Sequence, residues 1–226
     1  MRFKDVFSII GPAMVGPSSS HTAGAVRLGR VARHLFGSLP DAVEIVFYGS
    51  FADTYQGHGT DLAIVSGLLD YDTDDPRIPT SLIIAAQLGL DIQFKQGKGQ
   101  SWHPNTAKMT LYSDTRKLSV IGASIGGGNI EIINVNDFDV KFTGEYPTLV
   151  IFHQDRTGLI ADVADLLRRE AINIGHMDVD RKGRSGDAMT VIEVDSTMTE
   201  PLLQEISGMS GVYEVKKVEL MERRLS

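Results

Sequence analysis

The last third of the chain alternates between strand-like and helix-like runs in an order that permits few folds. From residue 148 onward the order is strand, helix, strand, strand, helix, strand, because apolar residues either cluster in short runs or recur at three- and four-residue spacing. This order predicts a ferredoxin-like sandwich, in which four antiparallel strands carry two helices on one face. We therefore expect an α+β protein with two domains, 1–143 and 144–226, and a boundary near Gly144.

The expected elements can be placed along the sequence. The second domain should have strands at 148–153, 172–180, 189–194 and 212–220, with helices near 159–167 and 202–209. The first domain should have helices at about 22–36, 62–69 and 79–88, and strands at 42–48, 91–94, 109–112, 117–123 and 130–135. Gly24 and Gly29 are costly inside a helix, so we expect each to pack closely against a neighbouring backbone.

A turn rich in hydroxyl groups precedes the first long helix. We call Gly16–Thr22 (GPSSSHT) the GPSSSHT turn. Pro17 fixes its own φ and stiffens the turn, and a serine here is a good helix N-cap. One serine would serve as a cap, whereas this turn carries Ser18, Ser19, Ser20, His21 and Thr22. Hydroxyls, free N–H groups and an imidazole at a positive helix end predict a site for a carboxylate or another small anion.

Three further polar clusters follow at separate places in the first domain. They are His58–Asp61 (HGTD), His103–Asn105 (HPN) and Ser124–Gly128 (SIGGG). The two glycines around His58 permit close backbone approach, and Thr60 or Asp61 can cap the next helix. The three glycines of the last cluster join two expected strands. They predict either a tight turn or a nest of backbone N–H groups for an anion.

Composition excludes several classes of protein. The net charge is −7 and no long basic run is present, which disfavours nucleic-acid binding. The sequence has no cysteine, so it offers neither disulfides, nor a thiol nucleophile, nor thiolate ligands for an iron–sulfur cluster. The first residues lack the apolar core of a signal peptide, and no run is long enough to span a membrane. We expect a cytoplasmic protein that binds neither membranes nor nucleic acids.

The second domain resembles an ACT domain. Asp155-Arg156-Thr157-Gly158 matches the Asp-Arg-Pro-Gly-like turn of that family, with Thr157 in place of proline. The Asn173-Ile174 pair fits as well. The resemblance implies that an effector would bind at Asp155, Arg156, Thr157 and Gly158, and that the domain forms a homodimer through the exposed edges of its sheet.

The first domain resembles the β subunit of the bacterial iron–sulfur-dependent L-serine dehydratases. The four clusters carry this resemblance, and they occur in the family's order with Tyr48-Gly49-Ser50 between the first two. The resemblance implies conversion of L-serine to pyruvate and ammonia. It also implies a 4Fe-4S cluster held by a separate partner α chain, which agrees with the absence of cysteine. The iron would act as a Lewis acid on the substrate hydroxyl.

The same resemblance implies roles for individual residues. His21, His58 and His103 are the candidates for proton handling. The candidate substrate-binding residues are Ser18, Ser19, Ser20, Thr22, Thr60, Asp61, Asn105, Gly126, Gly127 and Gly128.

Three alternatives stay open. The first is a serine–histidine hydrolase, which is disfavoured because the sequence contains no Gly-x-Ser-x-Gly elbow. The second is a zinc site from His21, His58, Asp61 and His103, which is disfavoured because these residues do not have a typical ligand spacing. A non-catalytic amino-acid-sensing regulatory subunit is the strongest of the three.

Overall fold

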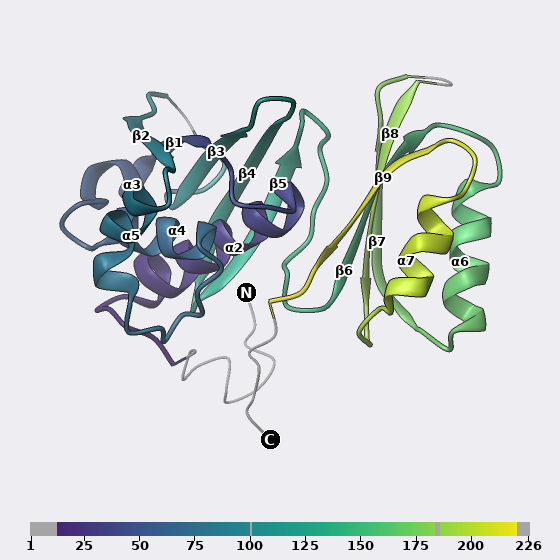
Figure 1. Cartoon of the computed structure of the whole chain (residues 1–226), viewed down its shortest axis with the longest axis horizontal. Helices are drawn as coiled ribbons and strands as arrows, with labels where there is room; N and C mark the ends of the chain where they lie inside the picture. The colour runs from purple at the N-terminus through teal and green to yellow at the C-terminus, as the bar shows by residue number, and fades with distance from the viewer. Residues whose placement is uncertain (1–12, 100, 184–185, 221–226) are drawn as a thin grey trace. The chain divides into compact units, whose positions relative to one another are not determined.

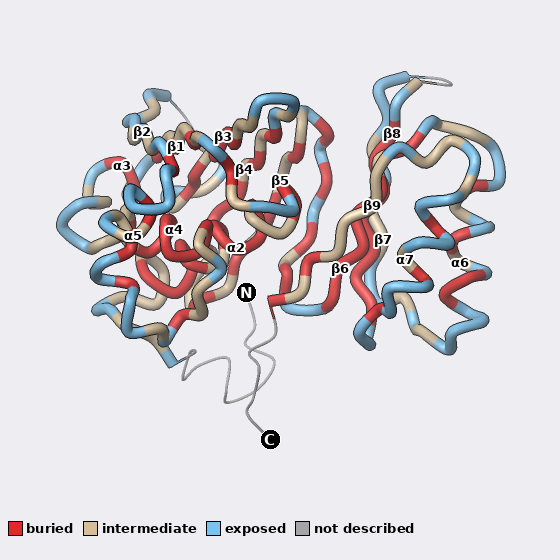
Figure 2. Tube along the Cα trace, viewed as in Figure 1, coloured by how far each residue is buried: buried red, intermediate tan, exposed pale blue. Residues whose placement is uncertain are grey.

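The computed structural model describes residues 13–99, 101–183 and 186–220. They divide between Asn136 and Asp137 into two compact units, an N-terminal unit and a C-terminal unit, whose elements are labelled in Figure 1. Each unit has its own sheet and its own set of buried apolar residues. Figure 2 colours the trace red at all buried residues. No helix within the described ranges is both long enough and apolar enough to cross a bilayer.

The N-terminal unit is built on a five-stranded sheet with the order β2-β1-β3-β4-β5. Its strands are β1 (Ala42–Tyr48), β2 (Asp91–Gln96), β3 (Thr106–Tyr112), β4 (Lys117–Gly126) and β5 (Asn129–Val135). Strands β1 and β2 are parallel, and the other neighbours are antiparallel. Every second residue of β1 is buried, as expected for a strand with one face on the core.

The helices of this unit include one that the sequence pattern did not predict. They are η1 (Ser19–Ala23), α2 (Gly24–Phe36), α3 (Gly49–Thr54), α4 (Thr60–Leu68), η2 (Ile78–Thr80) and α5 (Ser81–Gln87). The short helix α3 was not anticipated, because its six residues contain too few apolar positions to show a helical period. The run expected at 79–88 is a 3₁₀ turn followed by α5.

Two glycines let α2 and α4 approach each other closely. A Cβ atom added at Gly29 would lie 2.1 Å from the Ile64 carbonyl oxygen, and one added at Gly67 would lie 2.1 Å from that of Val26. The prediction of close backbone packing is therefore confirmed for Gly29. At Gly24 the close neighbour is the Ser124 side chain, 2.1 Å from an added Cβ, and not a backbone.

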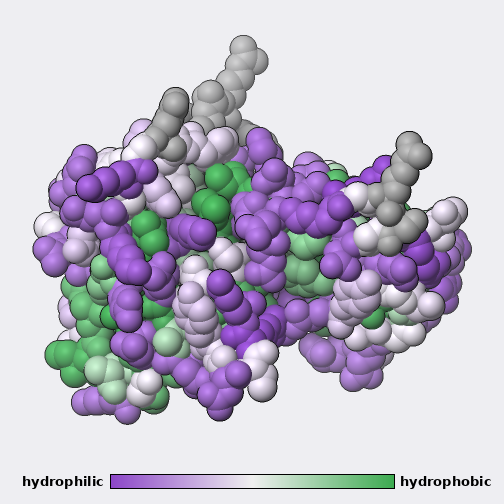
Figure 3. Space-filling model, turned by 90° about the horizontal axis from the view of Figure 1, so that it is seen from above, coloured by the Kyte–Doolittle hydropathy of each residue, from purple (hydrophilic) through white to green (hydrophobic). Residues whose placement is uncertain are grey.

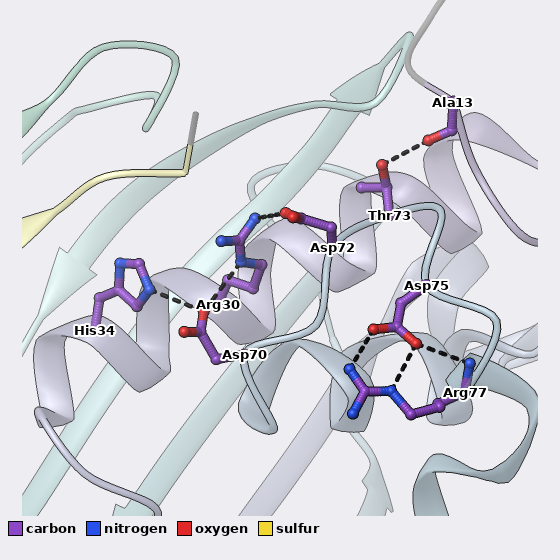
Figure 4. Close-up of polar contacts among 8 residues, drawn as sticks. All are labelled: Ala13, Arg30, His34, Asp70, Asp72, Thr73, Asp75 and Arg77. Carbon is purple, nitrogen blue, oxygen red and sulfur yellow. Dashed lines mark hydrogen bonds and ion pairs between the residues drawn. The ribbon is translucent and has the colours of Figure 1, made fainter. Parts of the chain in front are cut away.

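Ion pairs attach the loop after α4 to α2. The buried Arg30 side chain binds Asp70, with Nε 3.2 Å from Oδ1, and it also binds Asp72. His34 Nε2 lies 3.0 Å from the same Asp70 oxygen, as Figure 4 shows. Burial alone would raise the pKa of Asp70, but the hydrogen bonds and charges of His34 and Arg30 outweigh burial and lower it. Asp70 and Asp72 of the loop after α4 thus hold this loop against α2.

The C-terminal unit has the predicted ferredoxin-like fold. Its strands are β6 (Thr148–Gln154), β7 (Ile174–Arg181), β8 (Asp187–Val194) and β9 (Val212–Val218), and its helices are α6 (Leu159–Arg169) and α7 (Glu200–Ser207). The sheet is antiparallel with the order β7-β8-β6-β9. Both helices cover one face of this sheet in Figure 1. Leu149, Ile151 and Ile192 form a core there with residues of the two helices.

The segment Asp137–Thr143, which we call the strap, belongs to the C-terminal unit. Alternate backbone N–H groups of the strap donate to carboxylates of β7 and β8: Asp139 to Asp180 (2.9 Å), Lys141 to Asp178 (2.9 Å) and Thr143 to Glu193 (2.8 Å). The second unit therefore begins seven residues before the boundary expected at residue 144. The strap alternates polar and apolar residues, and Phe138, Val140 and Phe142 are buried. This period of two was the available sequence signal, and the expected boundary missed it.

Candidate functional site

Strand pairing brings two of the polar clusters and the Gly49-Ser50 pair to one end of the first sheet. Strand β1 ends at Tyr48, which pairs with Thr106 at the start of β3. Thr106 in turn pairs with Ala123, near the end of β4. The residues just beyond these positions are Gly49-Ser50, the HPN cluster and Ser124. Because the neighbouring strands are antiparallel, segments far apart in the sequence meet at this end.

The GPSSSHT turn contacts this end through a wide helical turn. The helix begins at Ser19 as the π-helical turn η1, whereas we expected helix only from about Thr22. Ser18 is the N-cap, and its hydroxyl accepts the His21 backbone N–H at 3.2 Å. The expected serine cap is thus present. Isolated π-turns are rare and occur often at functional sites.

The His21 imidazole lies at the centre of a small polar cluster. Its Nδ1 is 3.4 Å from the Ser18 hydroxyl, and its Nε2 is 3.4 Å from the Ser50 hydroxyl. The rings of His58 and Phe51 meet it edge to face, with centroids 4.8 Å and 5.2 Å away. His58 is exposed and His21 is half-buried, so the cluster opens to the surface. Two of the three predicted histidines are therefore in contact.

The surroundings of His21 favour the neutral form of its ring. Burial lowers the pKa of His21, and the nearby His58 lowers it further, while a hydrogen bond with the Ser50 backbone acts in the opposite direction. A neutral imidazole has one N–H donor and one acceptor nitrogen. It can therefore accept a proton at neutral pH, as a general base must.

His103 lies in a turn next to the start of α3, which carries Ser50 and Phe51. Its Nδ1 accepts the Asn105 backbone N–H at 3.1 Å, and the Asn105 side chain donates to the Ser124 carbonyl at 3.5 Å. The Pro104 carbonyl accepts the Phe51 N–H at 3.4 Å. The HPN cluster thus touches the start of α3 on one side and the end of β4 on the other.

Three buried hydroxyls near η1 lack a hydrogen-bond partner within the described part of the chain. They belong to Thr22, Thr60 and Ser124, and each of these residues is at most 3% exposed. Both α4 and β4, which carry Thr60 and Ser124, contact η1. Buried hydroxyls are normally satisfied, so each of these three is suited to bind a small polar ligand or a water molecule.

The expectation that Thr60 or Asp61 caps α4 is wrong, because Gly59 is the N-cap and no side chain that the structure describes caps this helix. Asp61 lies in the first turn of α4. Its Oδ1 accepts the Leu62 N–H at 2.9 Å. Burial raises the pKa of Asp61, and the backbone hydrogen bonds at Leu62 and Asp61 act against that rise.

The glycine cluster forms a tight turn, the first of the two alternatives. Gly126 pairs with Asn129 across the β4–β5 hairpin, and Gly127 and Gly128 have φ values of +63° and +80°. Two consecutive positive φ values favour glycine and suit the twist of a two-residue hairpin. The Gly128 carbonyl accepts a hydrogen bond from Arg27 Nη1 at 2.9 Å, which ties the hairpin to α2.

The predicted effector residues lie in the C-terminal unit, after β6. Asp155 pairs with Arg181 at 3.0 Å. Arg156 donates from Nε to the Ser210 carbonyl at 2.8 Å and from Nη2 to Asp162 at 2.9 Å, and its Nη1 donates to the Thr157 carbonyl at 3.3 Å. Gly158 has φ +91° and is the N-cap of α6. The loop is thus held by charged side chains on both sides.

The sequence analysis included Tyr48-Gly49-Ser50 in the resemblance but named neither Ser50 nor Phe51 as a site residue. The available signal was a glycine directly after an expected buried strand, and in the structure this Gly49 has φ +54°. No group of three or more histidine or acidic side chains with metal-binding geometry occurs within the described ranges.

Comparison with known proteins gives matches to both units. The sequence profile of the serine dehydratase beta chain family matches residues 3–85, and that of the ACT domain matches residues 147–209. The chain is 49% identical over 218 residues to the probable L-serine dehydratase, beta chain, of Bacillus subtilis, which covers 96% of this chain and 99% of that protein. It is 38% identical over 216 residues to the L-serine dehydratase, beta chain, of Peptoniphilus asaccharolyticus, covering 95% and 97%.

A more distant relative has a different name. The chain is 27% identical over 200 residues to the D-3-phosphoglycerate dehydrogenase of Methanocaldococcus jannaschii. The matched region covers 87% of this chain but only 37% of that dehydrogenase. A region similar to most of this chain is thus one part of a larger protein with another name.

Proposed function

This chain belongs to the L-serine dehydratase β-chain family and carries an ACT domain. We propose that it works as one subunit of an enzyme that converts L-serine to pyruvate and ammonia. The observation that carries the proposal is the 49% identity to a named β chain over nearly the full length of both proteins. A β chain implies an α chain, so the proposed partner is a separate L-serine dehydratase α subunit.

The proposed 4Fe-4S cluster would belong to that α subunit. Such clusters are held by cysteine thiolates, and this sequence has no cysteine. The residues of this chain therefore do not fit a cluster-binding role. We derive from them only binding, orientation and proton handling.

The cluster around His21 is suited to those tasks. Neutral His21 can take up a proton, and His58 lies against it at the open side. The GPSSSHT turn adds hydroxyls and helix-start N–H groups, which suit the substrate carboxylate. Proton abstraction next to a carboxylate needs both an oriented substrate and a base within hydrogen-bond reach. We propose that this chain supplies at least the first of these.

The surface of the N-terminal unit offers apolar contacts for a partner. Trp102, beside the HPN cluster, is 50% exposed, and Ile83 and Leu88 are 62% and 58% exposed. Figure 3 shows apolar patches among hydrophilic surface on the viewed face of this unit. Tryptophan is enriched at protein interfaces, so we propose that Trp102 contacts the α subunit.

Co-expression with an α chain tests the proposal. The two chains, purified together without oxygen, should form a coloured complex that produces pyruvate from L-serine, and this chain alone should not. Activity of the purified chain without iron would contradict the proposal.

Variants of the GPSSSHT turn test the site itself. Ser19→Ala or Ser20→Ala should raise KM for L-serine or lower kcat, while the fold should hold because both variants keep the Ser18 N-cap. His21→Gln should still bind the α chain but turn over far more slowly, since the loss of a general acid–base group typically costs about 10²–10⁴-fold. A wild-type rate in His21→Gln would move proton transfer to His58, His103 or the partner.

A second candidate is a regulatory subunit that senses an amino acid without taking part in catalysis. The similarity to D-3-phosphoglycerate dehydrogenase favours it, because a protein named for another reaction has a region similar to 87% of this chain. The two candidates separate in one assay. If the α chain alone turns over L-serine at the rate of the complex, and this chain only changes the response to amino acids, the regulatory role is correct.

The C-terminal unit is proposed to dimerise and to bind any effector near Asp155–Gly158. Its edge strand β7 has one unpaired side in the sheet order β7-β8-β6-β9, and such edges favour pairing with a second copy. Sedimentation of the full chain should give the mass of a dimer. A chain ending at Asn136, which lacks the C-terminal unit, should give the mass of a monomer. An unchanged number of subunits would contradict this dimer.

A further inference from the structure

Ser50 is the tertiary partner of the His21 ring. Ser18 lies in the same turn as His21 and also caps it. Ser50 comes from the start of α3, 29 residues further along the chain, and its hydroxyl lies 3.4 Å from Nε2. The two serines therefore contact opposite nitrogens of one ring, and Ser50 does so from a distant part of the sequence.

The place of Ser50 is itself set by the HPN cluster. Gly49 has φ +54°, and a Cβ atom added there would lie 2.6 Å from the Pro104 carbonyl oxygen. The next residue, Phe51, donates its N–H to the same carbonyl at 3.4 Å. The Ser50 carbonyl accepts the Thr54 hydroxyl at 2.7 Å. The first turn of α3 is therefore fastened on both sides of Ser50.

Phe51 also contacts the His21 ring. Its ring is fully buried and meets His21 at an interplanar angle of 66°. An imidazole with a hydroxyl at each nitrogen and an aromatic ring beside it has few orientations left. A hydroxyl can donate or accept, so Ser50 can stay bound to His21 in either neutral tautomer and after protonation.

We propose that Ser50 is a positioning residue for His21, holding the imidazole from the side opposite Ser18 so that the ring keeps one orientation as its protonation changes. Its effect on turnover rests on the proposed function, but the contact between Ser50 and His21 does not. Ser50 acts through His21 and is not assigned a contact with substrate.

The first measurement uses the full chain alone, with its histidine rings labelled for NMR. The chain has six histidines, and the His21 signals are identified by their loss in His21→Gln. In Ser50→Ala the His21 ring nitrogen shifts and pH midpoint should change, whereas those of exposed His176 should not. Ser50→Thr keeps the hydroxyl and should restore the His21 signals.

The second measurement uses the complex with the α chain. Ser50→Ala should lower kcat about 10- to 100-fold, the range expected for a misplaced catalytic group, with KM near that of the wild type. Ser50→Thr should recover most of this loss. Ser66→Ala is the control for stability alone, because the buried Ser66 hydroxyl donates only to the Ala63 carbonyl, at 2.7 Å within α4.

The outcomes separate the two proposals. If His21 signals in Ser50→Ala coincide with those of the wild type, the contact is wrong whatever the complex does. If those signals change but kcat does not, Ser50 has no positioning role. If the wild-type complex makes no pyruvate, the proposed function fails while the NMR measurement still decides the contact.

Discussion

The imidazole rings of His21 and His58 meet edge to face, with centroids 4.8 Å apart and planes at 86°. Two imidazoles at this distance cannot both carry a charge without repulsion. The contact therefore couples the protonation of a half-buried histidine to that of an exposed one, and it joins the GPSSSHT turn to the HGTD cluster.

We predict that His58→Gln raises the pKa of His21 but leaves it below the ordinary value of about 6.5. Burial is the largest cause of the lowered pKa and persists in the variant, whereas the effect of His58 is removed. An NMR titration of the His21 ring measures this pKa, with His176→Gln as the control. An unchanged midpoint would show that His58 exerts no charge effect.

The same shift predicts how stability depends on pH. The folded chain binds a proton at His21 less readily than the unfolded chain, so between the two pKa values the unfolded state holds more protons. The free energy of unfolding should therefore fall as pH drops below about 6.5, until pH passes the folded pKa. Urea titrations at several pH values give the free energy of unfolding of the wild type and of His21→Gln. This free energy should fall more steeply with decreasing pH in the wild type, and an equal pH dependence would count against the lowered pKa.

We predict that Gly49→Ala disturbs the site much more than Gly89→Ala. Both glycines have positive φ, +54° and +80°, so both substitutions strain the backbone by about 1–2 kcal/mol. Only at Gly49 would the new Cβ meet a backbone, at the Pro104 carbonyl, whereas nothing lies within 4 Å at Gly89. The His21 ring signals should move in Gly49→Ala alone. Equal effects of both variants would remove the Pro104 contact from the explanation.

We predict that Gly67→Ala destabilises the N-terminal unit by about 3 kcal/mol, the upper part of the range for overpacking. The added methyl would lie 2.1 Å from the Val26 carbonyl oxygen, so α2 and α4 must separate. Gly208→Ala is the control, since its nearest neighbour would be 3.5 Å away and its φ is −79°. Denaturant unfolding measures both. A Gly67→Ala variant as stable as the control would contradict the close crossing.

We predict that Glu193→Ala releases the end of the strap. Glu193 is 7% exposed, and its Oε1 accepts both the N–H and the hydroxyl of Thr143, at 2.8 Å and 2.7 Å. Each polar group left buried without a partner costs about 1–3 kcal/mol. Hydrogen exchange at the Thr143 amide should speed up in Glu193→Ala and much less in Glu193→Gln, which keeps an acceptor oxygen. Continued protection in Glu193→Ala would mean that another group holds the strap.

Elements that have a local signal could be predicted from the sequence. The order of runs from residue 148 predicted the ferredoxin-like sheet, because burial of one strand face and one helix face imposes periods of two and 3.6 residues. The stiff Gly-Pro turn with its serine cap is also local, since it depends on the φ preference of proline. For Gly126–Gly128 the sequence left a tight turn and an anion-binding nest as alternatives, and the structure shows the turn.

The contacts between polar clusters and the division into units depend on the tertiary structure. The segments around Ser50, the HPN cluster and Ser124 meet because β1, β3 and β4 begin or end at the same end of the sheet. Pairing between distant strands leaves no mark in a single sequence. The strap joins the C-terminal unit through Asp178, Asp180 and Glu193, whose carboxylates bind backbone N–H groups. Acidic residues on a strand ordinarily indicate a solvated surface, so their role depended on what the fold placed against them.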